Sequence, residues 1–239
     1  MGKGNAKIGR VVSIIPARGG SKGIPRKNLE NLKGCPLIVH SIRTSLECPL
    51  IERTIVSTND KEIAEIAIEN GAEVPFMRPE GISLDSSPDF PLFKHAVDWL
   101  KENENYRPDI IVQLRPTSPY RPPHLVSKAI EEFVEFGTAD SLRAVTVSSI
   151  TPYKMYIIEN KLLHPVLTLN DIFESYNMPR QLLPKVYLHG GWLDIFWTKT
   201  LEKYNSITGN IILPFIIDDK LADDIDTQRD LLLAEKKDK

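Results

Sequence analysis

The sequence predicts an α/β protein with a doubly wound, mostly parallel sheet. Runs rich in β-branched residues alternate with amphipathic runs between residues 11 and 148, which is typical of βαβ units. The first such run, at 11–15, is apolar at nearly every position, as in a strand buried on both faces of a sheet. It leads into a loop rich in glycine and positive charge, and ligands bind at this carboxyl edge in open α/β sheets.

Composition limits the classes of protein that fit. The chain has 239 residues, 41% of them hydrophobic, which predicts one domain at 11–239 behind a flexible leader at 1–10. A formal net charge of −2 argues against a nucleic-acid partner. We find no signal-like leader and no apolar run of roughly 18 residues, so we expect a cytoplasmic protein with no membrane span. Cys35 and Cys48 have no metal-ligand spacing, which fits a reducing compartment.

Local signals predict the elements in order. One apolar face predicts a helix at 36–46, and Asn59-Asp60 caps a second helix that Gly71 stops. Prolines within 116–123 exclude a helix before residue 125. Thr227 caps the last helix. The predicted strands are 11–15, 51–58, 73–78, 109–114, 140–148 and 210–215, and the predicted helices are 36–46, 59–70, 89–103, 124–136 and the segment after 227.

The loop after the first strand carries the strongest chemical signal. Cations and glycines interleave in it, namely Arg18, Lys22, Arg26 and Lys27 with Gly19, Gly20 and Gly23. Glycines let backbone N–H groups turn inward around an anion, and the cations neutralise a polyphosphate. The order matches neither G-x-x-x-x-G-K-[ST] nor G-x-G-x-x-G. A solvated basic turn is the alternative, which the preceding buried strand disfavours.

Residues 16–29, PARGGSKGIPRKNL, resemble the nucleotide-binding signature of the acylneuraminate cytidylyltransferases, which activate sialic acids and related nine-carbon sugar acids as CMP conjugates. The resemblance spans roughly 11–232 and includes PTSPYR at 116–121. It implies a Rossmann-like nucleotidyltransferase fold. It also implies CTP and a sugar acid as substrates.

The loop and the resemblance together assign the site residues. Arg18, Lys22, Lys27 and Asp226 are the expected catalytic residues. The resemblance puts Arg78 near the base and Asp85 in a loop that closes over the nucleotide. The other expected nucleotide-binding residues are Ala17, Gly19, Ser21, Asn28, Ser87, Pro116, Thr117 and Ser118. The expected sugar-binding residues are Arg115, Lys154, Arg180, Gln181, Gly190 and Asp194.

Two aspartates near the C-terminus predict a metal site. Asp224 and Asp226 are two apart, so in an extended segment both carboxylates project from one face toward a divalent cation, which we expect to be Mg²⁺. Acids that decorate a helix N-terminus are the alternative. The five histidines have no zinc-like grouping, and His189 is the one beside the inferred pocket.

The alternation of predicted strands and helices stops at 151–187. This segment reads as an insertion, and in the relatives the region forms a small β-containing arm that pairs with a second subunit and completes the neighbour's sugar pocket. Its apolar residues, such as Met155, Tyr156, Ile157 and Ile158, lack regular structure in which to be buried. We therefore expect a homodimer formed through this arm.

Together these features predict transfer of CMP from CTP to the anomeric hydroxyl of a 2-keto sugar acid, with release of pyrophosphate. A glycosyltransferase with a D-x-D metal site and a non-catalytic nucleotide-binding module are the alternatives. Two departures from the family pattern concern the sugar. Arg115 replaces a glutamine, and Gly190-Gly191-Trp192-Leu193-Asp194 replaces an Asn-Gly stretch that ends in tyrosine. We expect the new guanidinium, indole and carboxylate to line the sugar side and to change the preferred substrate.

Overall fold

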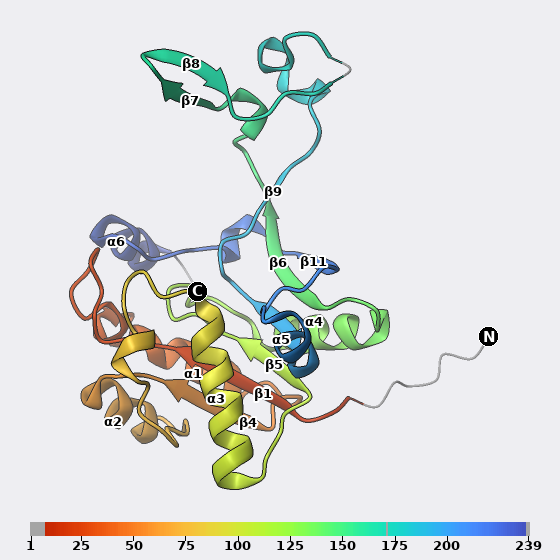
Figure 1. The fold of residues 1–239 in the computed structure, drawn as a ribbon. Helices are drawn as coiled ribbons and strands as arrows, with labels where there is room; N and C mark the ends of the chain where they lie inside the picture. The colour runs from red at the N-terminus through yellow and green to blue at the C-terminus, as the bar shows by residue number, and fades with distance from the viewer. Residues whose placement is uncertain (1–7, 171, 238–239) are drawn as a thin grey trace.

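The computed structural model describes residues 8–170 and 172–237. Figure 1 shows a body of strands and helices from which one arm projects. Most of the predicted leader, residues 1–7, lies outside the described residues. Arg10 is tied to the start of a strand, since its backbone N–H donates to Asp109 Oδ2 at 2.8 Å.

The central sheet of the described residues is mostly parallel, as predicted, and two short two-stranded sheets lie outside it. Its strands follow the order β11-β6-β10-β5-β1-β4, and β9 pairs with β6 off this path. β1 pairs in parallel with β4 and β5, and β11 pairs in parallel with β6. The strands are β1 (Val11–Pro16), β4 (Arg53–Ser57), β5 (Ile110–Gln113), β6 (Ser141–Val147), β9 (Tyr187–Leu188), β10 (Asp194–Trp197) and β11 (Ile212–Ile216).

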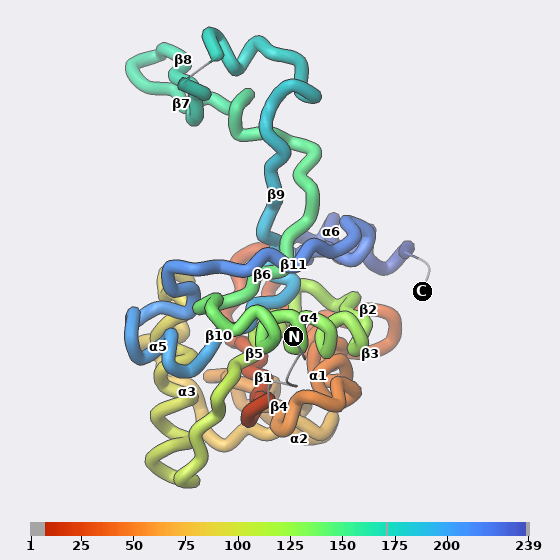
Figure 2. Tube along the Cα trace, turned by 90° about the vertical axis from the view of Figure 1, so that its right-hand side faces the viewer, coloured from red at the N-terminus to blue at the C-terminus, as the bar shows by residue number. Residues whose placement is uncertain are grey.

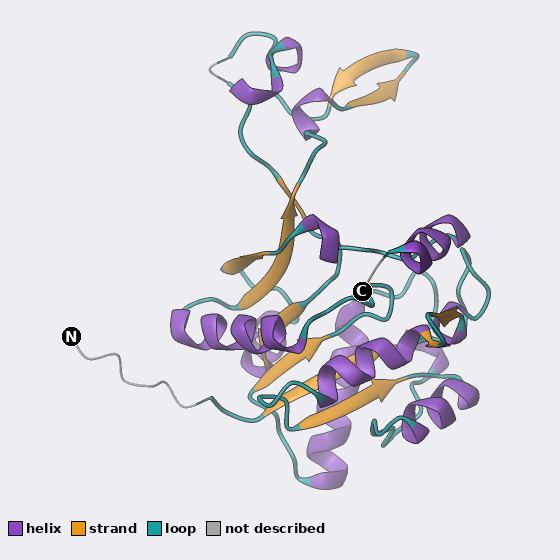
Figure 3. Cartoon of the chain, turned by 180° about the vertical axis from the view of Figure 1, so that it is seen from behind, coloured by secondary structure: helices purple, strands orange, loops and turns teal. Residues whose placement is uncertain are grey.

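Both faces of β1 are buried, which confirms the interpretation of its continuous apolar run. Val11 and Ile15 belong to one core cluster, and Val12 and Ile14 belong to the other. This alternation follows from the period of two in a strand. Side chains of α1 (Leu37–Leu46), α2 (Lys61–Glu69) and α4 (Pro123–Phe136) pack in the first cluster, and those of α3 (Asp89–Glu104) and α5 (Thr198–Tyr204) pack in the second. Helices therefore cover both faces of the sheet (Figure 3).

Local chemistry sets the ends of several helices. The Asp60 side chain accepts from the N–H groups of Glu62 and Ile63, and Thr227 forms a capping box with Asp230. Gly71 follows α2 with a φ of +88°, a conformation that favours glycine. The helices are α1 (Leu37–Leu46), α2 (Lys61–Glu69), α3 (Asp89–Glu104), α4 (Pro123–Phe136), α5 (Thr198–Tyr204) and α6 (Gln228–Lys236).

Two local predictions were wrong. Residues 73–78 form no strand. After a single bridge between Glu73 and Ile55 comes Pro75, which has no N–H for a ladder, and the chain bends at Phe76. α4 begins at Pro123 rather than after the prolines, since a first-turn N–H needs no partner in the helix.

β10 was not predicted, and it positions the site. It lies antiparallel between β5 and β6, with Asp194 paired to Gln113 and Arg143. Because β10 runs against β5, the residues just before it lie at the carboxyl edge of the parallel strands. The segment 189–193 therefore comes to the same edge as the cation-rich loop.

The arm leaves the body after β6 and returns through β9, as Figure 2 shows. It carries the hairpin of β7 (Tyr156–Glu159) and β8 (Leu162–Pro165). Large apolar side chains on the arm are exposed, with Ile158 at 74% and Phe173 at 90%. Cys35 and Cys48 are buried free thiols in the body. None of the helices in the described ranges is long and apolar enough to cross a membrane.

Candidate active site

A cavity of about 750 Å³ opens at the carboxyl edge of β1 and β5. It brings together residues from the cation-rich loop, the segment before α3, the proline-rich segment, the turn before β10 and the acidic segment. The predicted site residues in its lining are Arg18, Ser21, Lys22, Lys27, Asn28, Arg78, Asp85, Ser87, Arg115, Pro116, Thr117, Gly190, Asp224 and Asp226.

The cation-rich loop is held by contacts from its own backbone. Ala17 N–H donates to the Ser57 carbonyl at 3.0 Å, and Gly19 N–H donates to Asn59 Oδ1 at 3.1 Å. Asn28 is buried, and its amide donates to the Arg18 carbonyl at 2.9 Å. Ala17 and Gly19 are not in the cavity lining, so they act on the shape of the loop.

The three loop cations that line the cavity form ion pairs with carboxylates. Arg18 and Lys22 lie 2.5 Å and 3.1 Å from Asp85, and the hydrogen bond from Lys22 followed by the charge of Arg18 lowers the pKa of that carboxyl. Lys27 Nζ lies 2.7 Å from Asp226. Arg26 pairs outside the cavity with acids around the start of α2. Three cations thus face the cavity with partners that an incoming polyphosphate can replace.

Arg78 lies beneath this cluster. It is 6% exposed and donates to the carbonyl and the hydroxyl of Ser57. Burial, followed by repulsion from Arg18, lowers the pKa of Arg78 to about 10. Its position is therefore set by the end of β4.

The proline-rich segment links the loop to the acidic segment. The Thr117 carbonyl accepts from Ile225 N–H at 2.8 Å, which brings Thr117 next to the acidic segment. Burial raises the pKa of Asp224. Ser118 is fully buried outside the lining, and its hydroxyl has no hydrogen-bond partner within 8–170 and 172–237.

The two aspartates fit a divalent cation held together with phosphate. Both line the cavity, and the charge of Asp226 raises the pKa of Asp224, as expected for neighbouring carboxylates. Mg²⁺ commonly binds one or two carboxylates together with substrate phosphates. Within the described ranges, no group of three or more His, Cys, Asp or Glu side chains could hold a metal by itself.

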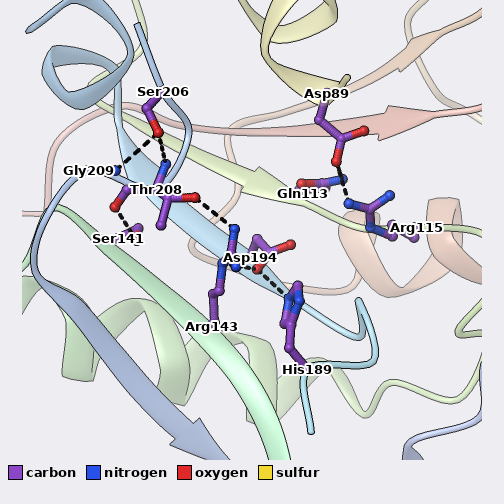
Figure 4. A network of polar contacts seen from close by, with 10 residues as sticks. All are labelled: Asp89, Gln113, Arg115, Ser141, Arg143, His189, Asp194, Ser206, Thr208 and Gly209. Atoms are coloured by element: carbon purple, nitrogen blue, oxygen red, sulfur yellow. Dashed lines mark hydrogen bonds and ion pairs between the residues drawn. The ribbon is translucent and has the colours of Figure 1, made fainter. Parts of the chain in front are cut away.

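The turn before β10 lines another part of the cavity through His189, Gly190 and Gly191. Arg115 lies beside it and forms an ion pair with Asp89, the first residue of α3 (Figure 4). Sequence reasoning missed Asp89, because an acid in the first turn of a helix is ordinary. Sequence reasoning placed His189 beside the pocket, and the side chain lies in the cavity lining.

Two expectations about the sugar side need correction. Trp192 is 1% exposed in the core, and its indole donates to the Tyr120 carbonyl at 3.0 Å. Asp194 is 3% exposed and contacts His189 instead of the cavity. Both side chains turn inward because their segment enters the centre of the sheet.

The remaining predicted sugar residues lie on the arm. Arg180 and Gln181 line a separate hollow of about 320 Å³ at its base, and Lys154 lies in a short turn before β7. None of the three lines the main cavity. Within a single chain the structure does not bring them to the phosphate loop.

Comparison with known proteins shows the family of the chain. The cytidylyltransferase family model matches residues 12–157. The chain is 31% identical to the CMP-N,N'-diacetyllegionaminic acid synthase of Legionella pneumophila over 232 residues, 95% of each chain. This chain belongs to the cytidylyltransferase family. It is an enzyme of that class, and the family resemblance predicted from its loop is confirmed.

Further comparisons extend to the fold. The cytidylyltransferase is 30% identical to the pseudaminic acid cytidylyltransferase of Campylobacter jejuni over 223 residues, 92% of this chain and 93% of the relative. A solved structure of CMP:2-keto-3-deoxy-manno-octonic acid synthetase with CTP has the same fold. It matches with a TM-score of 0.68 at 16% identity, over 95% of this chain and 97% of that chain.

Replacing Gly23 by alanine tests the contact between the loop and the acidic segment. A Cβ at Gly23 would lie 2.3 Å from the backbone oxygen of Asp226, so the two segments must separate. Such overpacking costs about 1–3 kcal/mol, and we expect Gly23→Ala to weaken CTP binding about fivefold or more in titration calorimetry. Gly81→Ala is the control, since a Cβ there meets nothing within 4 Å. Equal CTP affinity of the two variants would contradict this expectation.

Proposed function

We propose that this enzyme transfers CMP from CTP to the anomeric hydroxyl of a 2-keto sugar acid and releases pyrophosphate. The observation that carries the proposal is one cavity that joins the loop cations to the two aspartates. Relatives named as a legionaminic acid synthase and a pseudaminic acid cytidylyltransferase support a sugar acid as the acceptor. The test is pyrophosphate release from CTP and Mg²⁺ with and without sugar acids. Release that does not depend on a sugar acid would contradict the proposal.

Arg18, Lys22 and Lys27 would hold the triphosphate. Their present partners are Asp85 and Asp226, and the phosphates would replace these carboxylates. Catalysis would then depend on positioning and on stabilising the charge that develops around the α-phosphoryl group. No covalent intermediate with the protein is required.

Lys27→Ala tests this assignment. The Lys27 side chain is only 14% exposed, so its charge is preorganised in the cavity. Removing such a contact costs on the order of 3 kcal/mol in the transition state, and we expect a rate loss of ~100-fold or more at saturating CTP. The exposed Lys61→Ala is the control. A parental rate for Lys27→Ala would refute a role in phosphate binding.

We also propose that Asp224 and Asp226 hold Mg²⁺ together with the phosphates. When bound, the ion would neutralise phosphate charge and help pyrophosphate to leave. A metal ligand must be ionised, and burial raises the pKa of Asp224. Mg²⁺ affinity should therefore fall as the pH drops through this raised pKa.

Asp226→Asn should keep CTP binding and lose Mg²⁺-dependent turnover, because it removes one ligand charge and leaves the loop cations in place. The measurement is the initial rate across a Mg²⁺ titration. Asp98→Asn, an exposed acid paired with Lys94, is the control. If the double variant of Asp224 and Asp226 had the parental Mg²⁺ dependence, both residues would return to a structural role at the start of α6.

We propose that the preferred acceptor is not N-acetylneuraminate. Arg115 and Gly190 line the cavity where the family pattern has amides, and Asp89 adds a carboxylate. A site built to bind particular polar groups can reject analogues without them by ~10⁴-fold or more. A panel of sialic, legionaminic, pseudaminic and eight-carbon ulosonic acids tests this. The proposal fails if N-acetylneuraminate has the highest kcat/KM.

Finally, we propose a homodimer formed through the arm. Ile158 and Leu163 lie on β7 and β8 with 74% and 64% of their surfaces exposed. The cationic Lys154 and Arg180 would then border the partner's cavity. Light scattering should give about twice the 27.0 kDa chain mass. Ile158→Glu should yield monomers, and Ile68→Glu on α2 should not. A parent of 27 kDa would contradict the dimer.

A further inference from the structure

A histidine in the cavity lining is bonded to a buried carboxylate. His189 follows β9 and Asp194 begins β10, and His189 Nε2 lies 2.8 Å from Asp194 Oδ1 (Figure 4). The Asp194 side chain is 5% exposed and the His189 side chain 29%. Of the five histidines, all within the described residues, His189 is the one in the lining.

Asp194 has further support behind it. Arg143 Nε lies 3.5 Å from Asp194 Oδ1, and the Arg143 guanidinium donates to Thr208 Oγ1 at 2.7 Å. A buried carboxylate that engages one ring nitrogen fixes the orientation of the imidazole and stabilises its protonated form. Because Nε2 is engaged, Nδ1 is the ring nitrogen that remains for a substrate.

The turn that carries His189 packs against the segment that reaches the acidic residues. Gly191 has a φ of +71°, and a Cβ there would lie 2.8 Å from Arg115 Cδ. Two residues beyond Arg115, the Thr117 carbonyl accepts from the N–H of Ile225, the residue after Asp224. The histidine therefore lines the same cavity as the proposed phosphate and metal groups.

Three of the four carboxylates in the lining have other roles in the proposed complex. Asp89 is paired with Arg115, and Asp224 and Asp226 would hold Mg²⁺ with the phosphates. The fourth, Asp85, is the present partner of Arg18 and Lys22 in the phosphate loop. The acceptor hydroxyl must lose a proton during the reaction. An imidazole is a suitable acceptor because it can take up a proton and be stabilised by the carboxylate behind it.

We propose that His189 accepts the proton of the anomeric hydroxyl as that oxygen attacks the α-phosphorus of CTP, and that Asp194 positions His189. This inference rests on the proposed function. A bond forms between the anomeric oxygen and the α-phosphorus, and the bond from that phosphorus to the bridging oxygen breaks. The electron pair leaves with pyrophosphate, and the proton moves to His189 Nδ1.

The test compares His189→Ala and Asp194→Asn with the parent, using the sugar acid that gives the parent its highest rate. General-base catalysis contributes about 10²–10⁴-fold, so His189→Ala should lose kcat by about 100-fold or more while its CTP affinity stays parental in calorimetry. Added imidazole should restore part of this loss. Asp194→Asn should lower kcat with little change in the KM for the sugar acid. His124→Ala, on the exposed first turn of α4, should behave as the parent with or without imidazole.

The outcomes separate the two proposals. A parent that releases no pyrophosphate with any sugar acid would overturn the proposed function and this inference with it. An active parent with an equally active His189→Ala would overturn the inference alone. A loss of rate that imidazole does not restore, or that is matched by loss of CTP affinity, would assign His189 a structural role and also overturn it.

Discussion

The site depends on the close contact between the cation-rich loop and the acidic segment near the C-terminus. Lys27 and Asp226 are 199 residues apart in the chain and form an ion pair of 2.7 Å. Gly23 lies so close to the Asp226 backbone that it leaves no room for a side chain. This contact places the loop cations and the two aspartates in one cavity. It also joins the end of the chain to the first βα unit, since Ile24 and Leu37 share a small core cluster with Ile225 and Leu231.

The second constraint is the direction of β10. An all-parallel sheet would bring only the ends of its strands to the ligand edge, but an antiparallel strand brings its beginning there. β10 therefore delivers His189 and Gly191 to the cavity and places Asp194 at the first paired position of the strand. The same geometry buries Trp192, whose Nε1–H finds the Tyr120 carbonyl. Because β10 runs antiparallel, His189 and Gly191 line the cavity, whereas Trp192 and Asp194 are buried and support them.

Four of the five lysine and arginine side chains in the cavity lining are paired with carboxylates. Arg18 and Lys22 share Asp85, Lys27 faces Asp226, and Arg115 faces Asp89. Cations that keep such partners avoid the cost of an unpaired charge in a partly desolvated cleft. An anionic substrate then exchanges one set of ion pairs for another. The position of Asp85 is consequently coupled to whatever occupies the loop.

Much of this enzyme follows from local sequence. The continuous apolar run of β1 requires burial on both faces of the sheet. The glycines and cations after it predict a phosphate-binding loop at the carboxyl end of β1, whichever strands lie beside it. The caps at Asp60 and Thr227 and the stop at Gly71 involve neighbours in the chain, so they are predictable without the fold. The spacing of two between Asp224 and Asp226 is also local, and it predicted that both carboxylates project from one face of their segment.

Tertiary structure decided the rest, because it depends on which distant segments meet. Composition favoured a strand at 73–78, but the structure has only one bridge there, between Glu73 and Ile55 of β4, and Pro75 follows it. No local pattern distinguishes Asp89 from an ordinary helix acid, and only packing sets it against Arg115. The inward turn of Trp192 and Asp194 follows from the insertion of β10 between β5 and β6, a pairing of strands far apart in sequence. Residue types determined the chemistry available to this chain, and long-range strand order determined which of those residues face the cavity.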